Sequence, residues 1–180
     1  MPRVEQLDGV AVLEPDVFAD DRGYFLESWN ARSFVELVGE DVTFVQDNHS
    51  HSATGVLRGL HHQVPPSAQG KLVRCVRGRV WDVAVDVRRD SPTLGDWVAE
   101  ELSEHNQRQL WISTGFAHGF LVLEGPADVL YKATDFYDPV SERSIAWDDP
   151  RLAIDWPLDT EPVLSAKDAA APRFDPADLP

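Results

Sequence analysis

Short extended runs recur along almost the whole chain, and glycine, proline, aspartate or asparagine interrupts them at close intervals. Most runs span about five to nine residues and either alternate in polarity or stay apolar, as β-strands do. Many short strands separated by turns predict an all-β sandwich or barrel, and a small jelly roll of this kind keeps a cavity between its sheets. The runs are Gly23–Trp29, Val42–Gln46, Lys71–Val76, Arg79–Val87, Trp97–Leu102, Gln109–Ile112, Gly119–Leu123 and Val129–Thr134.

Helical patterns are scarce. One short helix is predicted after Asn30, which is a suitable N-cap, and Gly39 is placed to end it. Its apolar face would carry Phe34, Leu37 and Val38. We therefore expect an all-β fold with few helices.

Two further features concern turns and the end of the chain. Arg77-Gly78 lies between two apolar runs and predicts a hairpin turn. The stretch from Asp148 to Pro180 is rich in proline, aspartate and alanine, which predicts a tail packed around the body. With 180 residues and neither a repeat nor a linker, the chain is expected to form one domain over residues 1–180.

The formal charge of −15 argues against non-specific binding to nucleic acid or to anionic membranes. No apolar run approaches the roughly 20 residues that span a bilayer. The N-terminal residues lack the apolar core of a signal peptide, and the lone Cys75 has no second cysteine to pair with. We expect a cytoplasmic protein.

The segment Gly55–Gln63, followed by Lys71, sets an arginine, two histidines and a lysine among apolar strand residues. Charged and titratable side chains are costly to desolvate unless something binds them. Imidazole is also well matched to proton transfer near neutral pH. For one such residue a polar pair on a wet sheet face is sufficient explanation, but the whole set indicates a functional site.

Other polar clusters are open to two interpretations. On a strand, Gln46, Asn48, Ser50 and Ser52 share one face, which suits either sugar hydroxyls or a solvated sheet edge. His118 stands between two Gly-Phe pairs and is either steered into a cavity or a satisfied core histidine. The same choice between site and ordinary packing applies to Arg22, Phe25, Glu27, Tyr131, Tyr137 and Asp168.

Taken together, these residues resemble the dTDP-4-dehydrorhamnose 3,5-epimerase family over about Phe18 to Asp168. The ordered motifs are Asp21-Arg22-Gly23, the Gln46–Ser52 alternation, Val56–His61, Lys71–Arg74, Asp82–Asp86, Ser91-Pro92-Thr93, Gly115–Phe120, Tyr131, Tyr137 and Ser165-x-Lys167-Asp168. The resemblance implies a cupin-type double-stranded β-helix jelly roll. It also implies a homodimer that exchanges N-terminal strands.

The resemblance further implies epimerisation of a dTDP-4-keto-6-deoxyhexose at C3, C5 or both, without a cofactor or metal. His61 would be the base, Asp168 its orienting carboxylate, Lys71 the enolate-stabilising cation and Tyr131 the acid. Arg22 and Arg58 would contact anionic groups, with Arg22 a candidate for the partner subunit's site. Phe25 and Glu27 would hold the thymine base. The remaining pocket residues would be Gln46, Asn48, His118, Tyr137 and Lys167.

Three alternatives stay open. A mono-epimerase of deoxysugar biosynthesis would share these motifs. A cupin metalloenzyme would use His61, His62 and His118, although neighbouring strand residues diverge and the usual His-x-His pair is not found. A non-catalytic sugar-nucleotide binder would be expected to lose the base, the lysine or the tyrosine.

Overall fold

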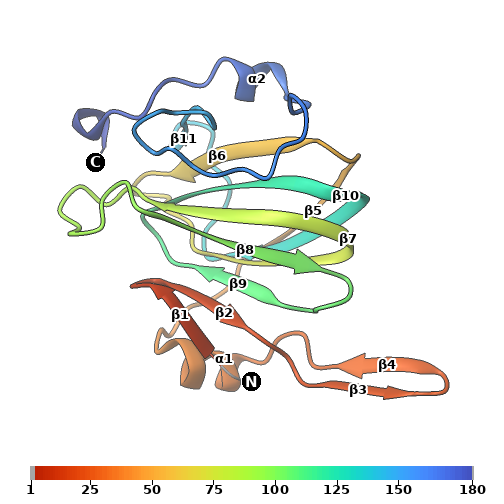
Figure 1. Ribbon diagram of the computed structural model, residues 1–180. Helices are drawn as coiled ribbons and strands as arrows, with labels where there is room; N and C mark the ends of the chain where they lie inside the picture. The colour runs from red at the N-terminus through yellow and green to blue at the C-terminus, as the bar shows by residue number, and fades with distance from the viewer. Residues whose placement is uncertain (1–2, 180) are drawn as a thin grey trace.

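The computed structural model describes residues 3–179, and strands make up most of their regular structure (Figure 1). The all-β prediction is confirmed. The strands are β1 (Arg3–Leu7), β2 (Val10–Leu13), β3 (Val17–Asp20), β4 (Gly23–Leu26), β5 (Gln46–Ser52), β6 (Leu57–Gln63), β7 (Lys71–Asp86), β8 (Trp97–Ser103), β9 (Gln109–Ile112), β10 (Phe116–Ala133) and β11 (Glu142–Ser144). The helices are α1 (Ala31–Val38), α2 (Ala166–Ala169) and the 3-10 helix η1 (Pro176–Asp178).

Two long antiparallel strands, β7 and β10, organise the fold. They pair from Lys71 opposite Ala133 to Asp86 opposite Phe116. The prediction of a hairpin turn at Arg77-Gly78 is therefore wrong, because β7 continues past these residues without reversing direction. Gly78 has a φ of 75°, and a Cβ there would stand 2.4 Å from the carbonyl oxygen of Glu124. The glycine thus marks a corner where β7 bends closely against β10, and the register shifts at the same point of β10.

The corner divides both long strands into halves with different neighbours. The first half of β7 pairs with β9 and the second half with β8. The first half of β10 pairs with β6 and the second half with β5. The separate runs predicted on each side of the corner are the halves of these two strands. This doubling back of strand pairs forms the two layers of a jelly roll.

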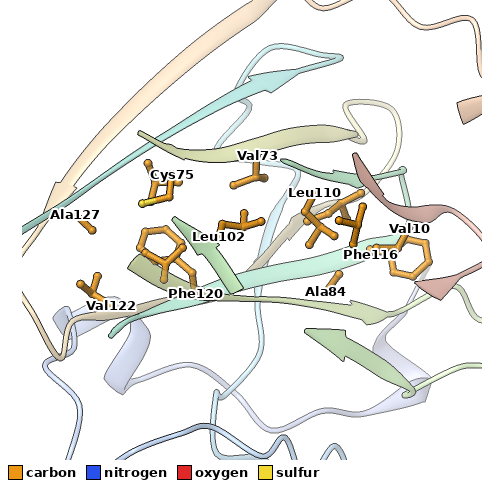
Figure 2. Packing of buried hydrophobic residues seen from close by; sticks show 14 residues of the cluster. Val10, Val73, Cys75, Ala84, Leu102, Leu110, Phe116, Phe120, Val122 and Ala127 are labelled. Atoms are coloured by element: carbon orange, nitrogen blue, oxygen red, sulfur yellow. The ribbon is translucent and has the colours of Figure 1, made fainter. Parts of the chain in front are cut away.

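An apolar core fills the space between the two layers (Figure 2). Val73 and Cys75 come from the first half of β7, whereas Phe120 and Val122 come from the first half of β10. All four side chains are at most 4% exposed. Burial of this set supplies the main stabilisation of the sandwich, at about 25 cal/mol for each Å² of apolar surface removed from water.

The C-terminal stretch covers the outer side of one layer. Leu152, Trp156 and Phe174 are buried there against Leu57 and Val85 of the strands. Their burial requires the tail to follow the body closely, and it brings α2 over β6. The tail therefore delivers its polar residues to a fixed place.

Helix α1 covers the outer side of the other layer and forms as the sequence predicts. The Asn30 side chain accepts hydrogen bonds from the backbone N–H groups of Arg32 and Ser33. Gly39 ends the helix with a φ of 79°. Phe34 packs edge-on against Trp111 of β9, with ring centroids 5.1 Å apart. The predicted run Val42–Gln46 is wrong as a strand, since β5 begins only at Gln46.

Strands β3 and β4 form a separate two-stranded sheet that extends away from the body (Figure 1). Phe18 is 65% exposed and Phe25 is 70% exposed. The hairpin therefore offers aromatic side chains to the surroundings. Across residues 3–179, no helix combines the length and the apolar character needed to cross a lipid bilayer.

Candidate active site

His61 on β6 and Asp168 on α2 form a close pair, with 2.7 Å between Nε2 of the imidazole and Oδ1 of the carboxylate. Asp168 is buried, and its second oxygen accepts a hydrogen bond of 2.7 Å from the Ser165 hydroxyl. The Asp168 backbone N–H in turn donates to the Ser165 oxygen. These contacts fix the carboxylate relative to the imidazole ring. Asp168 is therefore not a solvated acid in a surface turn.

The environment keeps the His61 imidazole neutral near pH 7. Burial lowers the pKa of His61 below its usual value, although the Asp168 carboxylate opposes that effect. A neutral ring whose Nε2–H donates to Asp168 leaves Nδ1 free to accept a proton. The pair has the chemistry of a general base held in one tautomer.

Lys71 and Tyr131 lie side by side on the neighbouring strands β7 and β10. The Lys71 Nζ atom is 5.8 Å from the centre of the Tyr131 ring. Burial lowers the pKa of Lys71 to about 8, against the opposing charges of Asp82 and Glu142. Burial raises the pKa of Tyr131, so the phenol keeps its proton. The site thus combines a partly desolvated cation with a neutral acid.

His118 stands directly opposite His61 in the β6–β10 pairing. Its Nε2 lies 2.9 Å from Oδ1 of Asp82, and both residues are buried. His118 is therefore a partnered histidine at the base of the site. Asp82 belongs to the Asp82–Asp86 motif, but no site role was predicted for it, although an acid inside an apolar strand run indicates a buried partner.

The predicted alternation along β5 is confirmed. Gln46, Asn48 and Ser50 are half-buried, whereas the residues between them are exposed. The Gln46 amide donates to Oδ1 of Asn48 and accepts from the backbone N–H of Tyr137. Arg58 donates to the Ser52 hydroxyl at 3.0 Å. A row of uncharged polar groups therefore follows one edge of the site.

Glu142 on β11 joins two predicted site residues. One of its oxygens accepts from Lys167 at 2.6 Å, and the other accepts from the Tyr137 phenol at 2.9 Å. Glu142 was not predicted as a site residue, because it stands in a polar stretch without a motif of its own.

Three predicted residues lie elsewhere within the chain. Arg22 and Phe25 belong to the extended hairpin, and Glu27 follows it. The Arg22 side chain is 90% exposed and forms an ion pair with Asp20, two residues away. One chain does not bring these residues to its own His61.

His62 lies on the opposite side of β6 from the His61–Asp168 pair. It is buried, it borders a hollow of about 600 Å³ together with Val87 and Arg88, and burial lowers its pKa to about 4. Among residues 3–179, its Nδ1 has no hydrogen-bond partner, and no cluster of three or more His, Cys, Asp or Glu side chains could hold a metal ion.

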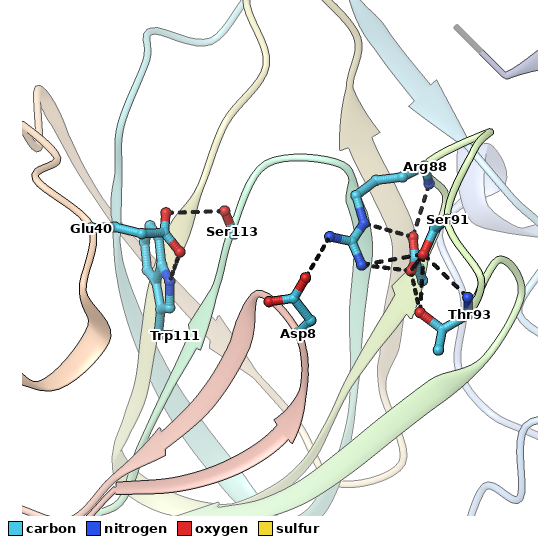
Figure 3. A network of polar contacts seen from close by, with 8 residues as sticks. Asp8, Glu40, Arg88, Ser91, Thr93, Trp111 and Ser113 are labelled. Atoms are coloured by element: carbon cyan, nitrogen blue, oxygen red, sulfur yellow. Dashed lines mark hydrogen bonds and ion pairs between the residues drawn. The ribbon is translucent and has the colours of Figure 1, made fainter.

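The Ser91-Pro92-Thr93 motif has a structural role next to that hollow (Figure 3). The buried Asp86 carboxylate accepts hydrogen bonds from Arg88, Ser91 and Thr93. Burial would raise the pKa of Asp86, but these bonds outweigh it and lower the pKa to about 2. The network fixes the loop after β7.

Comparison with known proteins identifies close relatives. The model of the dTDP-4-dehydrorhamnose 3,5-epimerase family matches residues 5–176. The epimerase of that name from Salmonella typhimurium is 60% identical over 168 residues, which cover 93% of this chain and 92% of the relative. The Pseudomonas aeruginosa epimerase is 60% identical over 169 residues, covering 94% of this chain and 93% of the relative.

Solved structures agree with the sequence comparison. A Legionella pneumophila 3,5-epimerase in complex with dTDP-4-keto-L-rhamnose superimposes with a TM-score of 0.94 at 51% identity, covering 99% of this chain and 97% of the other. A 3'-monoepimerase from Streptomyces bikiniensis superimposes with a TM-score of 0.89 at 35% identity, covering 96% of this chain and 86% of the other.

Proposed function

This chain belongs to the dTDP-4-dehydrorhamnose 3,5-epimerase family, and we propose that His61 and Asp168 perform the proton abstraction of its reaction. The protein is an epimerase of dTDP-4-keto-6-deoxyhexoses with a cupin-type jelly-roll fold. A ketone at C4 makes the hydrogens at C3 and C5 weakly acidic. Inversion then needs a base, stabilisation of the enolate oxygen and an acid on the opposite face of the sugar.

The 2.7 Å contact between His61 and Asp168 carries the assignment of the base. Nδ1 of His61 takes the proton from carbon, and the imidazolium that forms is stabilised by the Asp168 carboxylate. Because Asp168 is held by Ser165, the ring does not need to reorient during the reaction. The geometry of this pair supports its role as the base.

Lys71 is the proposed partner of the enolate oxygen. Its ammonium group is partly desolvated, and a cation stabilises a developing negative charge more strongly where water is excluded. Tyr131, beside Lys71, is the proposed acid, since burial keeps its phenol protonated. His61 comes from β6 and Tyr131 from the half of β10 that pairs with β5, which supports their action on different faces of the sugar.

The other predicted residues are proposed to hold the substrate. Arg58 would contact anionic groups. The remaining pocket would be shaped by Gln46, Asn48, His118, Tyr137 and Lys167. These side chains, together with the base, the acid and the lysine, supply the whole reaction. We therefore propose that the enzyme needs neither metal nor cofactor, and its activity should survive chelation.

The test is NMR of dTDP-4-keto-6-deoxyglucose incubated with the protein in D₂O. Deuterium at both C3 and C5, with dTDP-4-keto-L-rhamnose as product, is the expected result. Unchanged substrate would overturn the proposal. Incorporation at C3 alone or C5 alone would identify the second candidate, a mono-epimerase, which the likeness to the Streptomyces bikiniensis 3'-monoepimerase keeps in consideration.

We also propose that the enzyme is a cytoplasmic homodimer in which each hairpin completes the site of the other subunit. The exposed Phe18 and Phe25 support this arrangement, because paired exposed aromatic side chains are typical of interfaces. Arg22, Phe25 and Glu27 would then reach the nucleotide in the partner's site. The N-terminal strands would be exchanged, so that β1 and β2 take the place beside β9 of the other subunit that they occupy here within one chain. Residues 1–180 would form a single domain, with a C-terminal tail from about residue 148.

Mixing two inactive variants tests the dimer. His61→Ala removes the base, and Arg22→Ala with Phe25→Ala removes the hairpin contacts. In a random mixture half of the dimers are hybrids with one intact site, so about a quarter of the wild-type activity should return. No recovery after subunit exchange, or a monomer by sedimentation, would contradict the proposal.

A further inference from the structure

Glu142 is the point at which two separate parts of the site are joined. Its side chain is 20% exposed, and each carboxylate oxygen has its own partner. One accepts from the Lys167 ammonium at 2.6 Å, and the other accepts from the Tyr137 phenol at 2.9 Å. In the pairing of β11 with β6, Glu142 is opposite Gln63, two positions from the pair formed by Ser144 and His61. The carboxylate therefore stands on the strand next to the base.

The bond to Lys167 bears on the position of Asp168. Lys167 and Asp168 are neighbours on α2, a helix of four residues. So short a helix has little stability of its own, and its tertiary contacts decide where it lies. Asp168 is tied to His61 and Ser165, and the Lys167–Glu142 ion pair adds a separate connection to β11. Loss of that pair would leave α2 with fewer attachments on its site side.

The hydrogen bond from Tyr137 to Glu142 fixes a second side chain of the proposed substrate site. Tyr137 is 55% exposed and lies on the segment between β10 and β11. Its backbone N–H donates to Gln46, and the next residue donates its N–H to Gln63. These bonds hold the main chain, whereas the phenol is held by Glu142 alone among the hydrogen bonds found in residues 3–179. Glu142 thus sets the direction of the ring.

We propose that Glu142 is a positioning residue of the epimerase, which holds Lys167 with its helix and Tyr137 in the arrangement that receives the substrate. The inference rests on the proposed roles of the His61–Asp168 pair and of Lys167 and Tyr137. An exposed ion pair is worth little for stability, so a purely structural pair would have small effects. The Glu142 carboxylate instead orders two proposed substrate-binding groups, Lys167 and Tyr137. Its loss should therefore lower catalytic activity more than it lowers stability.

The same charge acts on the proposed enolate partner. The titratable groups that face Lys71 are Asp82 on its own strand, His61 and His62 on β6, Glu142 on β11, Lys167 on α2 and Tyr131 on β10. Burial lowers the pKa of Lys71, and the negative charge of Glu142 opposes this change. Removal of the charge should lower that pKa further.

Glu142→Gln is the direct test. The uncharged amide can still form hydrogen bonds with the Tyr137 phenol, but it cannot form an ion pair with the Lys167 ammonium group. We expect kcat to fall by about tenfold and KM to rise severalfold, because the groups around the reacting carbon are less well ordered. The alkaline limb of kcat/KM should move to lower pH. Glu101→Gln is the matched control, since Glu101 forms a similar 2.9 Å ion pair with Arg79 away from the site.

A double-mutant cycle separates positioning from a general structural defect. If Glu142 acts on α2 through Lys167, the kcat of Glu142→Gln with Lys167→Met should match that of Lys167→Met alone. Melting temperatures should show that all variants are folded. If Glu142→Gln does not fold, a second cycle compares Tyr137→Phe and Lys167→Met with the variant that carries both substitutions. Fully additive losses in the cycle would overturn the proposal.

Wild-type kinetics and an unshifted pH profile in Glu142→Gln would also overturn it. Failure of the wild-type protein to exchange deuterium at C3 or C5 would instead reject the proposed function. The two failures are therefore distinguishable in one set of assays.

Discussion

Nε2 of His61 and Oδ1 of Asp168 are 2.7 Å apart, although 107 residues separate them along the chain. The histidine is fixed by strand pairing, whereas the aspartate is delivered by the tail. Folding of the tail over β6 is therefore a condition for forming the base, and the structure links the packing of Trp156 and Phe174 to the chemistry.

The first prediction follows from this contact. Asp168→Asn keeps the size of the side chain but removes the charge that stabilises an imidazolium. By analogy with the orienting aspartate of a catalytic triad, kcat should fall by about 10³-fold or more. Deuterium exchange at C3 and C5 measures the effect. Asp155→Asn, which changes an exposed acid of the same tail, should retain full exchange, and equal losses in both variants would contradict the assignment.

The second prediction separates proton removal from proton return. Tyr131→Phe removes the proposed acid but leaves His61 and Lys71 in place. Exchange of deuterium into the substrate should stay within about tenfold of wild type, whereas net inversion should fall by about 10²-fold or more. The ratio of exchange to product, followed by NMR, gives the result. Tyr24→Phe on the hairpin is the control, and loss of exchange in parallel with inversion would show that Tyr131 is not a separate acid.

Local sequence signals were sufficient for part of the fold. Helix α1 was predictable because Asn30 and Gly39 satisfy its ends with neighbouring residues. The polar face of β5 was predictable because alternation on a strand depends only on position. The corner at Gly78 was not, since a glycine with positive φ fits both a hairpin and a bend. Only the pairing partner, β10, decides between the two.

Some residues of the site could likewise be predicted from the sequence, and others could not. Family motifs were sufficient to select His61, Lys71, Tyr131 and Asp168, which the fold brings together. Glu142 was missed, and Asp82 was selected only as part of a motif without a role. The importance of each depends on a partner distant in sequence, Lys167 for Glu142 and His118 for Asp82. Arg22 was selected, but the chain leaves it on the extended hairpin, and its proposed place in a site depends on the proposed second subunit.

The third prediction is a pH profile. The pKa of Lys71 is lowered to about 8, so its ammonium form is lost as pH rises through that value. The pKa of His61 is lowered below its usual 6.5, so the neutral base persists down to a lower pH. We therefore expect kcat/KM to rise with pH below pH 6.5, as His61 loses its proton, and then to stay constant. It should fall again near pH 8, as Lys71 loses its proton.

Lys71→Arg checks the assignment of the alkaline limb. Guanidinium remains protonated throughout this range, so the residual activity should no longer fall near pH 8. Lys71→Met should lose activity at every pH. An unchanged alkaline limb in Lys71→Arg would assign that limb to another group.

The fourth prediction concerns the backbone that carries the motif arginine and histidine. Gly59 has a φ of 126°, and a Cβ at this position would stand 2.5 Å from the Cα of Gly119 on β10. Gly59→Ala must therefore both strain its own backbone and push two paired strands apart. Gly55 also has a positive φ, 78°, but a Cβ there would meet nothing within 4 Å.

The two substitutions separate strain from collision. Gly55→Ala should lower the free energy of unfolding by about 1–2 kcal/mol, which is the cost of the left-handed conformation alone. Gly59→Ala should lose a further 1–3 kcal/mol or so, because the overpacked contact is backbone and has no rotamer to change. Urea denaturation followed by tryptophan fluorescence measures both values. Equal losses would mean that β6 and β10 separate without cost at this point, and His61 would then not be held rigidly by their pairing.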